Sequence, residues 1–80
     1  MKLDVEADAR RIHREEAWEH WRALKKIGLT SQEVDVHLPN LRDVMRRGGL
    51  RPKDFGADEE EFDKVVKYAK AIQTEAWKHQ

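Results

Sequence analysis

Three polar residues in the first third of the chain have a spacing that could support metal binding or acid–base chemistry. His13, Glu16 and His20 are three and four positions apart, which places them on adjacent turns of one helical face. Imidazole and carboxylate groups bind zinc or iron, but a closed site needs a fourth ligand. The last stretch of the chain offers only Gln73 near its apolar centre. We therefore predict no metal and no cofactor, with His13, Glu16 and His20 as the weaker metal-binding alternative.

No other residue pattern is typical of an enzyme. The chain has no cysteine, so it has no thiolate nucleophile. Thr30 and Ser31 are better explained as the cap and the first residue of a helix. Gly48 and Gly49 are adjacent, unlike the spaced glycines of phosphate-binding loops. We predict no catalytic residue and no enzymatic activity.

A basic segment at residues 42–53 suggests a second kind of partner. It carries one acidic residue, Asp43, against five basic ones, a local charge of +4; the basic residues are Arg42, Arg46, Arg47, Arg51 and Lys53. A short helix from Ser31, a turn at 38–40 and a basic helix from Leu41 together resemble a helix-turn-helix, whose second helix would enter the major groove. Nucleic-acid binding through these five residues is therefore the alternative function. The zero net charge of the whole chain favours an arginine rim in solvent instead.

The elements that would position these residues are helices. Apolar residues recur with a period near 3.6, and no stretch alternates as a strand would. We predict a single all-α domain over residues 1–80, a small bundle of two long helices at about 4–27 and 59–78. Two short helices, at 31–37 and 41–47, lie between them, because Pro39 disfavours helical geometry at the residue before it and Gly48 can end the second one.

Local signals specify the start of the helix at residue 31 and one further turn. Thr30 and Glu33 have the spacing of a capping box, and Leu29 and Val34 occupy the positions of a hydrophobic staple. Residues 51–54 are expected to form a single helical turn, since proline is tolerated at a first helical position and a glycine follows at position 56.

Length and composition limit the remaining possibilities. Eighty residues form one domain, and 40% of them are charged, with sixteen basic residues balanced by sixteen acidic ones. No apolar run approaches the ~18 residues of a membrane span. We expect a soluble, cytoplasmic protein with no membrane partner.

The strongest functional signal is an excess of apolar surface. The chain has three tryptophans, more than a core of this size needs. We expect Trp21 and Trp77 mainly in the core and Trp18 against a partner. We predict a non-enzymatic interaction module, a small regulator, inhibitor or assembly factor, which docks through a helix face on another protein or on a second copy as a homodimer. The partner-binding residues are the apolar Ile12, Trp18 and Trp21 and the steering charges Arg14, Arg42, Arg46 and Arg47.

Overall fold

The computed structural model describes residues 5–78, with side chains from Ala9 onward. Three α-helices and one short 3-10 helix follow one another: α1 Val5–Leu24, α2 Ser31–Gly48, η1 Pro52–Phe55 and α3 Glu59–Lys78. No strand occurs between residues 5 and 78, so the prediction of a small all-α bundle is confirmed. The last helix has the predicted bounds, and residue 4, where we expected the first helix to begin, lies outside the described residues.

The first helix ends three residues earlier than expected. After Leu24 the helix ends in a tighter turn. The Lys25 N–H donates both to the Trp21 carbonyl, four residues before it, and to the Arg22 carbonyl, three residues before it, each at 3.2 Å. Gly28 then adopts the left-handed conformation, with φ of 77°. Ile27, which lies within the predicted range of the first helix, is instead 98% exposed in this connection.

The middle of the chain differs most from the prediction. The residues of the two expected short helices are helical, but they form one continuous helix, α2, which passes through Pro39. The proline ring has no N–H to donate to the Asp35 carbonyl, but both residues are exposed, so water can serve that carbonyl. Four apolar residues spaced three or four apart are buried on both sides of the proline: Val34, Leu38, Leu41 and Val44. Burial of this continuous apolar face stabilises the helix through the proline.

The predicted start of α2 is confirmed. The Glu33 N–H donates to Thr30 Oγ1 at 3.2 Å, and the Thr30 N–H donates to Glu33 Oε1 at 3.3 Å, which is the reciprocal capping box. At the other end, Gly49 takes the left-handed conformation and the Leu50 N–H donates to the Met45 carbonyl at 2.8 Å. Gly48, which we expected to end the helix, is its last helical residue.

The turn predicted at residues 51–54 is also present, as η1. The Arg51 N–H donates to Asp54 Oδ2 at 2.8 Å, and Gly56 ends the turn with φ of 80°. Phe55 within this turn is buried. The turn therefore fixes one aromatic side chain against the helices.

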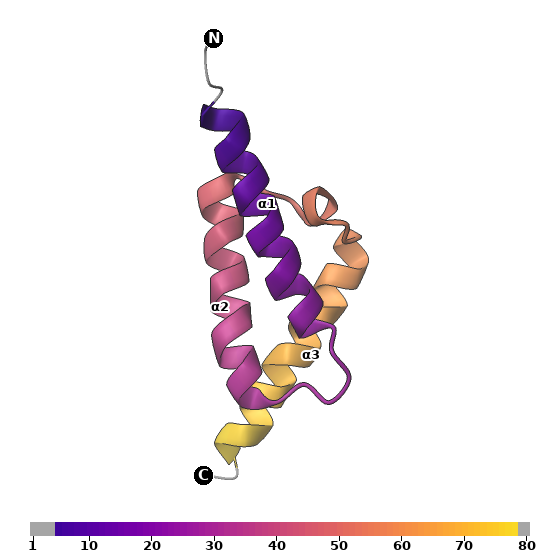
Figure 1. Cartoon of the computed structure of the whole chain (residues 1–80). Coiled ribbons are helices and arrows are strands. Elements are labelled where there is room, and N and C mark those ends of the chain that lie inside the picture. The colour runs from indigo at the N-terminus through magenta and orange to yellow at the C-terminus, as the bar shows by residue number, and fades with distance from the viewer. Residues whose placement is uncertain (1–4, 79–80) are drawn as a thin grey trace.

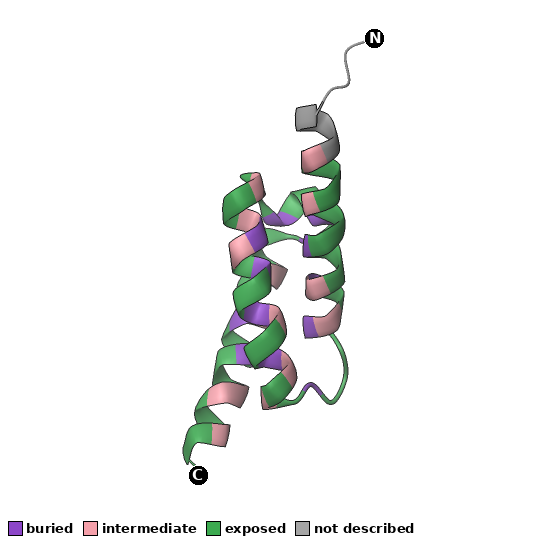
Figure 2. Cartoon of the chain, turned by 60° about the vertical axis from the view of Figure 1, so that its left-hand side comes forward, coloured by how far each residue is buried: buried purple, intermediate pink, exposed green. Residues whose placement is uncertain are grey.

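The helices α1 and α2 run antiparallel and form a hairpin, and α3 packs against α2 (Figure 1). The short η1 contacts both α1 and α3 and so joins the hairpin to the last helix. Buried residues line the faces that the helices turn toward one another, whereas the far end of α3 is mostly exposed (Figure 2).

Three aromatic rings form the junction between α1, η1 and α3. The ring of Trp21 lies 5.9 Å from that of Phe55 and 5.7 Å from that of Phe62, measured between centroids, and the two phenylalanine rings are 6.2 Å apart. These separations are typical of favourable aromatic pairs. The cluster holds the first helix in a set position relative to η1.

Candidate interaction surface

Trp18 is the large apolar side chain that α1 presents to solvent beside this aromatic junction. It is 48% exposed, one turn before the buried Trp21 on the same helix. The Arg22 guanidinium carbon lies 5.3 Å from the centroid of the Trp18 ring, within the range of a cation–π contact. Trp18 thus combines a large apolar area with a charged neighbour, which are properties of residues that dominate protein interfaces.

Three surface hollows meet at Trp18. One, of about 420 Å³, lies between α1 and η1, where Arg11 and Arg14 face Asp54 and Gly56. A second lies along α1 toward Lys26, and a third lies over Trp21 and Phe55. We call Trp18 and the charged residues around these hollows the Trp18 surface; the charged residues are Arg11, Arg14, Glu15, Glu19, Arg22, Lys25, Lys26 and Asp54.

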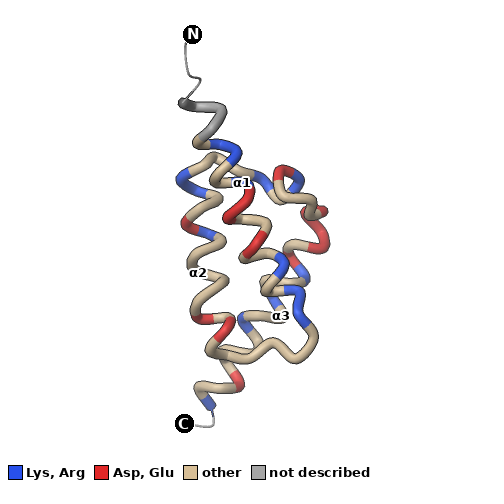
Figure 3. Tube along the Cα trace, viewed as in Figure 1, with Lys and Arg blue, Asp and Glu red and all other residues tan. Residues whose placement is uncertain are grey.

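The Trp18 surface carries more positive than negative charge. Five of its charged residues are basic and three are acidic, whereas the whole chain is neutral. Some of this charge is already paired, since Lys25 Nζ lies 2.6 Å from Glu61 Oε1 and Lys26 Nζ lies 3.2 Å from Glu33 Oε2. Figure 3 shows acidic residues along the middle of α1 and basic residues toward its end. Arg14 and Arg22, which are exposed beside Trp18, can contact acidic groups.

The structure brings together some of the predicted partner-binding residues and separates others. Arg14 lines the same hollow as Trp18. Trp21 is only 3% exposed and belongs to the core, so it offers almost no contact area to a partner. Ile12 is 49% exposed, but six residues of helix place it about 120° around α1 from Trp18. The predicted apolar contact face is therefore reduced to Trp18.

The predicted arginines of α2 lie outside the Trp18 surface. Arg46 and Arg47 both pair with Asp43, at 3.2 Å and 3.1 Å, which neutralises part of the local charge. Arg42 is exposed on the same helix, while Arg51 and Lys53 flank the start of η1. The turn that a helix-turn-helix needs at 38–40 is absent, because these residues lie inside α2. The basic segment is thus not presented as a helix-turn-helix.

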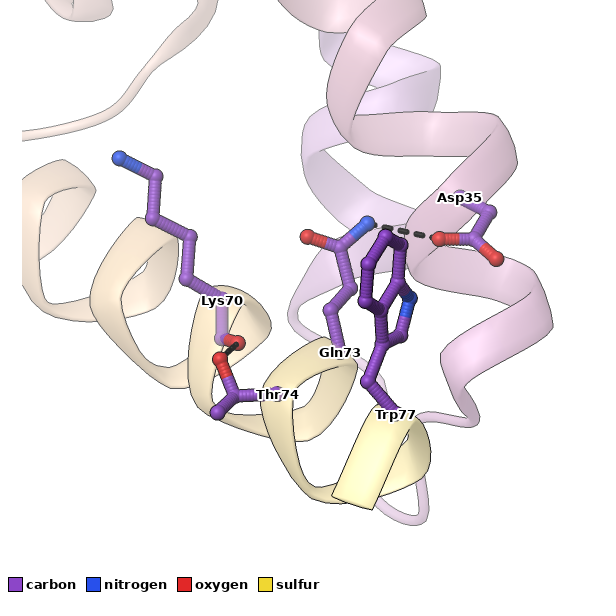
Figure 4. Close-up of a pocket in the computed structure, with 5 residues that line it drawn as sticks. All are labelled: Asp35, Lys70, Gln73, Thr74 and Trp77. Atoms are coloured by element: carbon purple, nitrogen blue, oxygen red, sulfur yellow. Dashed lines mark hydrogen bonds between the residues drawn. The ribbon is translucent and has the colours of Figure 1, made fainter. Parts of the chain in front are cut away.

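Trp77 is exposed, contrary to our expectation. It is 78% exposed and lies in the last turn of α3, at the end of the bundle where α2 begins (Figure 1). It lines a hollow between α2 and α3 in which Gln73 Nε2 donates to Asp35 Oδ1 at 2.7 Å (Figure 4). The Lys70 amine points away from this hydrogen bond in the same view. We assign this hollow no function.

An imidazole pair joins α1 to α2. The Nδ1 atoms of His20 and His37 are 3.0 Å apart, and the ring centroids are 5.3 Å apart. The centroid separation exceeds the Nδ1 separation by 2.3 Å, about twice the distance from the centre of an imidazole ring to its vertex, so the two nitrogens point directly at each other. A hydrogen bond between them requires one ring to donate its Nδ1–H and the other to accept it.

This geometry does not match the metal site considered from the sequence. Metal–nitrogen bonds of ~2.0 Å leave no room for an ion between nitrogens that face each other at 3.0 Å. His13 does not join the pair: its Nδ1 atom is buried without a hydrogen-bond partner, near Gly48. Within residues described with side chains, no group of three histidine or acidic residues is placed to hold a metal ion.

Sequence reasoning missed His37, although a signal for it exists. His37 follows the buried Val34 by three residues and precedes the buried Leu41 by four, so it lies on the apolar face of α2. Protein surroundings lower the pKa of His20 by excluding water from it, and His37 lowers this pKa further, whereas Glu16 and Glu19 oppose the shift.

Comparison of the chain with protein-family models, with curated proteins and with solved structures found no match. None of the helices within residues 5–78 is sufficiently long and apolar to traverse a bilayer. The class that the fold defines is a small three-helix bundle, and its function has to be argued from its own surfaces.

Proposed function

We propose that this chain is a non-enzymatic interaction module that binds an acidic protein surface through the Trp18 surface. The observation that carries the proposal is the half-exposed Trp18 ring at the meeting point of three hollows, beside the Arg22 guanidinium. A tryptophan docked in a partner pocket supplies buried area, and the surrounding arginines favour negative partners and speed encounter.

The rigid placement of Trp18 supports this role. The neighbouring Trp21 is locked by Phe55 and Phe62, so the part of α1 that bears Trp18 is held before any partner arrives. A preorganised contact loses less conformational entropy on binding than a mobile one. The chain would act as a regulator, inhibitor or assembly factor by occupying its partner's surface.

The experiment compares two single variants, Trp18→Ala and Trp77→Ala, as baits in affinity capture with nuclease present. Both remove an exposed tryptophan, but only Trp18 lies on the proposed surface. Proteins that bind the wild type and Trp77→Ala, are lost with Trp18→Ala and dissociate as salt rises support the proposal once each is purified and titrated directly. Equal binding by the two variants would contradict it.

The Trp18 surface could instead bind a second copy of the chain and form a homodimer. Light scattering at ~10 μM protein would then give twice the 9.5 kDa chain mass. If Trp18→Ala restores the monomer mass and Trp77→Ala does not, the partner is a second copy of the chain and not an acidic protein.

Nucleic-acid binding through Arg42, Arg46, Arg47, Arg51 and Lys53 stays the alternative. One feature of the fold favours it: the contact between His13 and Gly48 places the first described arginines of α1 at the same end of the hairpin as Arg46 and Arg47 (Figure 3). Fluorescence anisotropy with duplex DNA in ~50 mM salt tests this alternative. No binding there, or capture that survives nuclease, would leave the protein partner.

A further inference from the structure

We propose that His20 and His37 form a latch between α1 and α2 that is controlled by protonation. The latch is closed when both imidazoles are neutral or when only one of them is charged, and it opens when both are charged. The proposal is independent of the Trp18 surface. Its basis is the direct approach of two Nδ1 atoms from different helices.

The chemistry of the contact follows from counting protons. In the neutral pair one Nδ1–H donates to the lone pair of the other ring, and a single added proton on a ring's outer nitrogen leaves this hydrogen bond in place. When both rings are protonated, each Nδ1 carries a hydrogen, so two N–H groups face each other at a nitrogen separation of 3.0 Å. The hydrogen bond is lost and two positive charges repel, so acid separates the rings.

The charges around the pair come from both helices. On α1, Glu16 and Glu19 favour the charged form of His20. On α2, Glu33 lies one turn before His37, but its carboxylate is already bound to Lys26 and Thr30. Exclusion of water and the neighbouring His37 outweigh the two glutamates, so the net shift of the His20 pKa is downward.

The latch lies in the middle of the interface between α1 and α2. The buried residues around it are apolar, such as Ala17 on α1 and Leu41 on α2. Most of the interface therefore has no proton to gain, and the histidine pair makes its stability depend on pH. Separation of the rings would loosen the helix that carries Trp18.

Protonation of His20 makes the folded chain less stable in acid. The folded-state pKa of His20 lies below its ordinary value of 6.5. Between these two pKa values the unfolded chain therefore binds more protons than the folded chain. Stability from this group is therefore complete above pH 6.5 and is lost as the pH falls through 6.5 toward the lower folded-state pKa.

The test measures urea unfolding of the wild type and of His37→Gln at a series of pH values between ~8 and ~5, the range in which histidine titrates. Glutamine can still donate to the His20 nitrogen but cannot become charged. We expect the wild type to lose more stability than His37→Gln over this range, and the His20 titration midpoint, followed by NMR, to rise in the variant. Gln73→Ala is the matched control, because it removes an interhelical hydrogen bond whose donor does not titrate.

Equal pH dependence of the wild type and His37→Gln would overturn the latch. A second measurement needs no variant: long-range nitrogen–proton NMR spectra of the wild type at pH ~8, above the histidine range, report which ring nitrogen carries the proton. The latch requires one of the two rings to carry it on Nδ1. Protons on the outer nitrogen of both rings would exclude it.

Discussion

Gly48 of α2 lies against His13 of α1 so closely that a Cβ atom at position 48 would be 2.9 Å from the His13 Cβ atom. The same atom would be 3.1 Å from the Leu50 Cγ atom, so it has no free side to move toward. The approach of the two helices at this end of the hairpin therefore depends on the absence of a side chain at residue 48.

Gly48→Ala is predicted to destabilise the fold. Alanine favours a helix over glycine by about 1 kcal/mol, but overpacking typically costs about 1–3 kcal/mol, so we expect a net loss of about 1 kcal/mol. Urea unfolding followed by circular dichroism measures the change. A gain in stability would mean that α1 and α2 do not meet at this residue.

Pro39→Ala is predicted to stabilise the chain. The substitution supplies the N–H that the Asp35 carbonyl lacks, and Pro39 is exposed, so no packing is lost. Proline inside a helix costs about 3 kcal/mol relative to alanine. Proline also restricts the unfolded chain, which offsets part of this cost, so we expect Pro39→Ala to raise the free energy of unfolding by about 1–2 kcal/mol. The measurement is the midpoint of thermal unfolding. An unchanged or lower midpoint in Pro39→Ala would indicate that the helix is broken at residue 39 into two short helices.

Two adjacent tryptophan truncations on α1 are predicted to differ strongly. Trp21→Ala empties the aromatic junction with Phe55 and Phe62 and should cost about 3–5 kcal/mol. Trp18→Ala removes a half-exposed ring and should cost about 1 kcal/mol or less. Circular dichroism is the appropriate signal, because both variants change the fluorescence. Similar losses for the two variants would make Trp18 a core residue and remove it from the proposed interface.

Lys26→Met is predicted to raise the pKa of Glu33. Hydrogen bonds from Lys26, and then from Thr30, hold the pKa of this carboxyl below its ordinary value of 4.5. A lowered carboxyl pKa contributes stability above 4.5 that is lost as the pH falls through the folded-state pKa, so the variant should be less sensitive to acid in that range. An NMR titration of Glu33 in both proteins measures the shift, with Lys70→Met as a control lysine on α3. No change of the Glu33 pKa would contradict the Lys26 contact.

Helix type and several boundaries could be predicted because their causes are local. The capping box of Thr30 and Glu33 and the turn at Pro52–Phe55 each depend on residues within one helical turn. The bounds of α3 and the all-α class follow from the spacing of apolar residues along the chain. Trp18 is half-exposed, in agreement with the expectation that it lies outside the core.

Other features depended on which helix lies beside which. Pro39 remains inside a helix because the apolar residues on both sides of it share one buried face, which a local proline rule does not consider. Trp77 has an apolar position on α3, but the packing of the helices leaves it mostly exposed, in a hollow that it shares with Asp35 of α2. His37 gains its partner His20 only when the chain folds back on itself.

The sequence by itself thus determined the helices, their caps and the apolar face of each, because hydrogen bonds and periodicity within a few turns decide them. Tertiary structure alone decided which polar groups meet and which tryptophans remain exposed. Contacts such as His20 with His37, and Gly48 with His13, join residues 17 and 35 positions apart, and their pairing depends on how two helices pack.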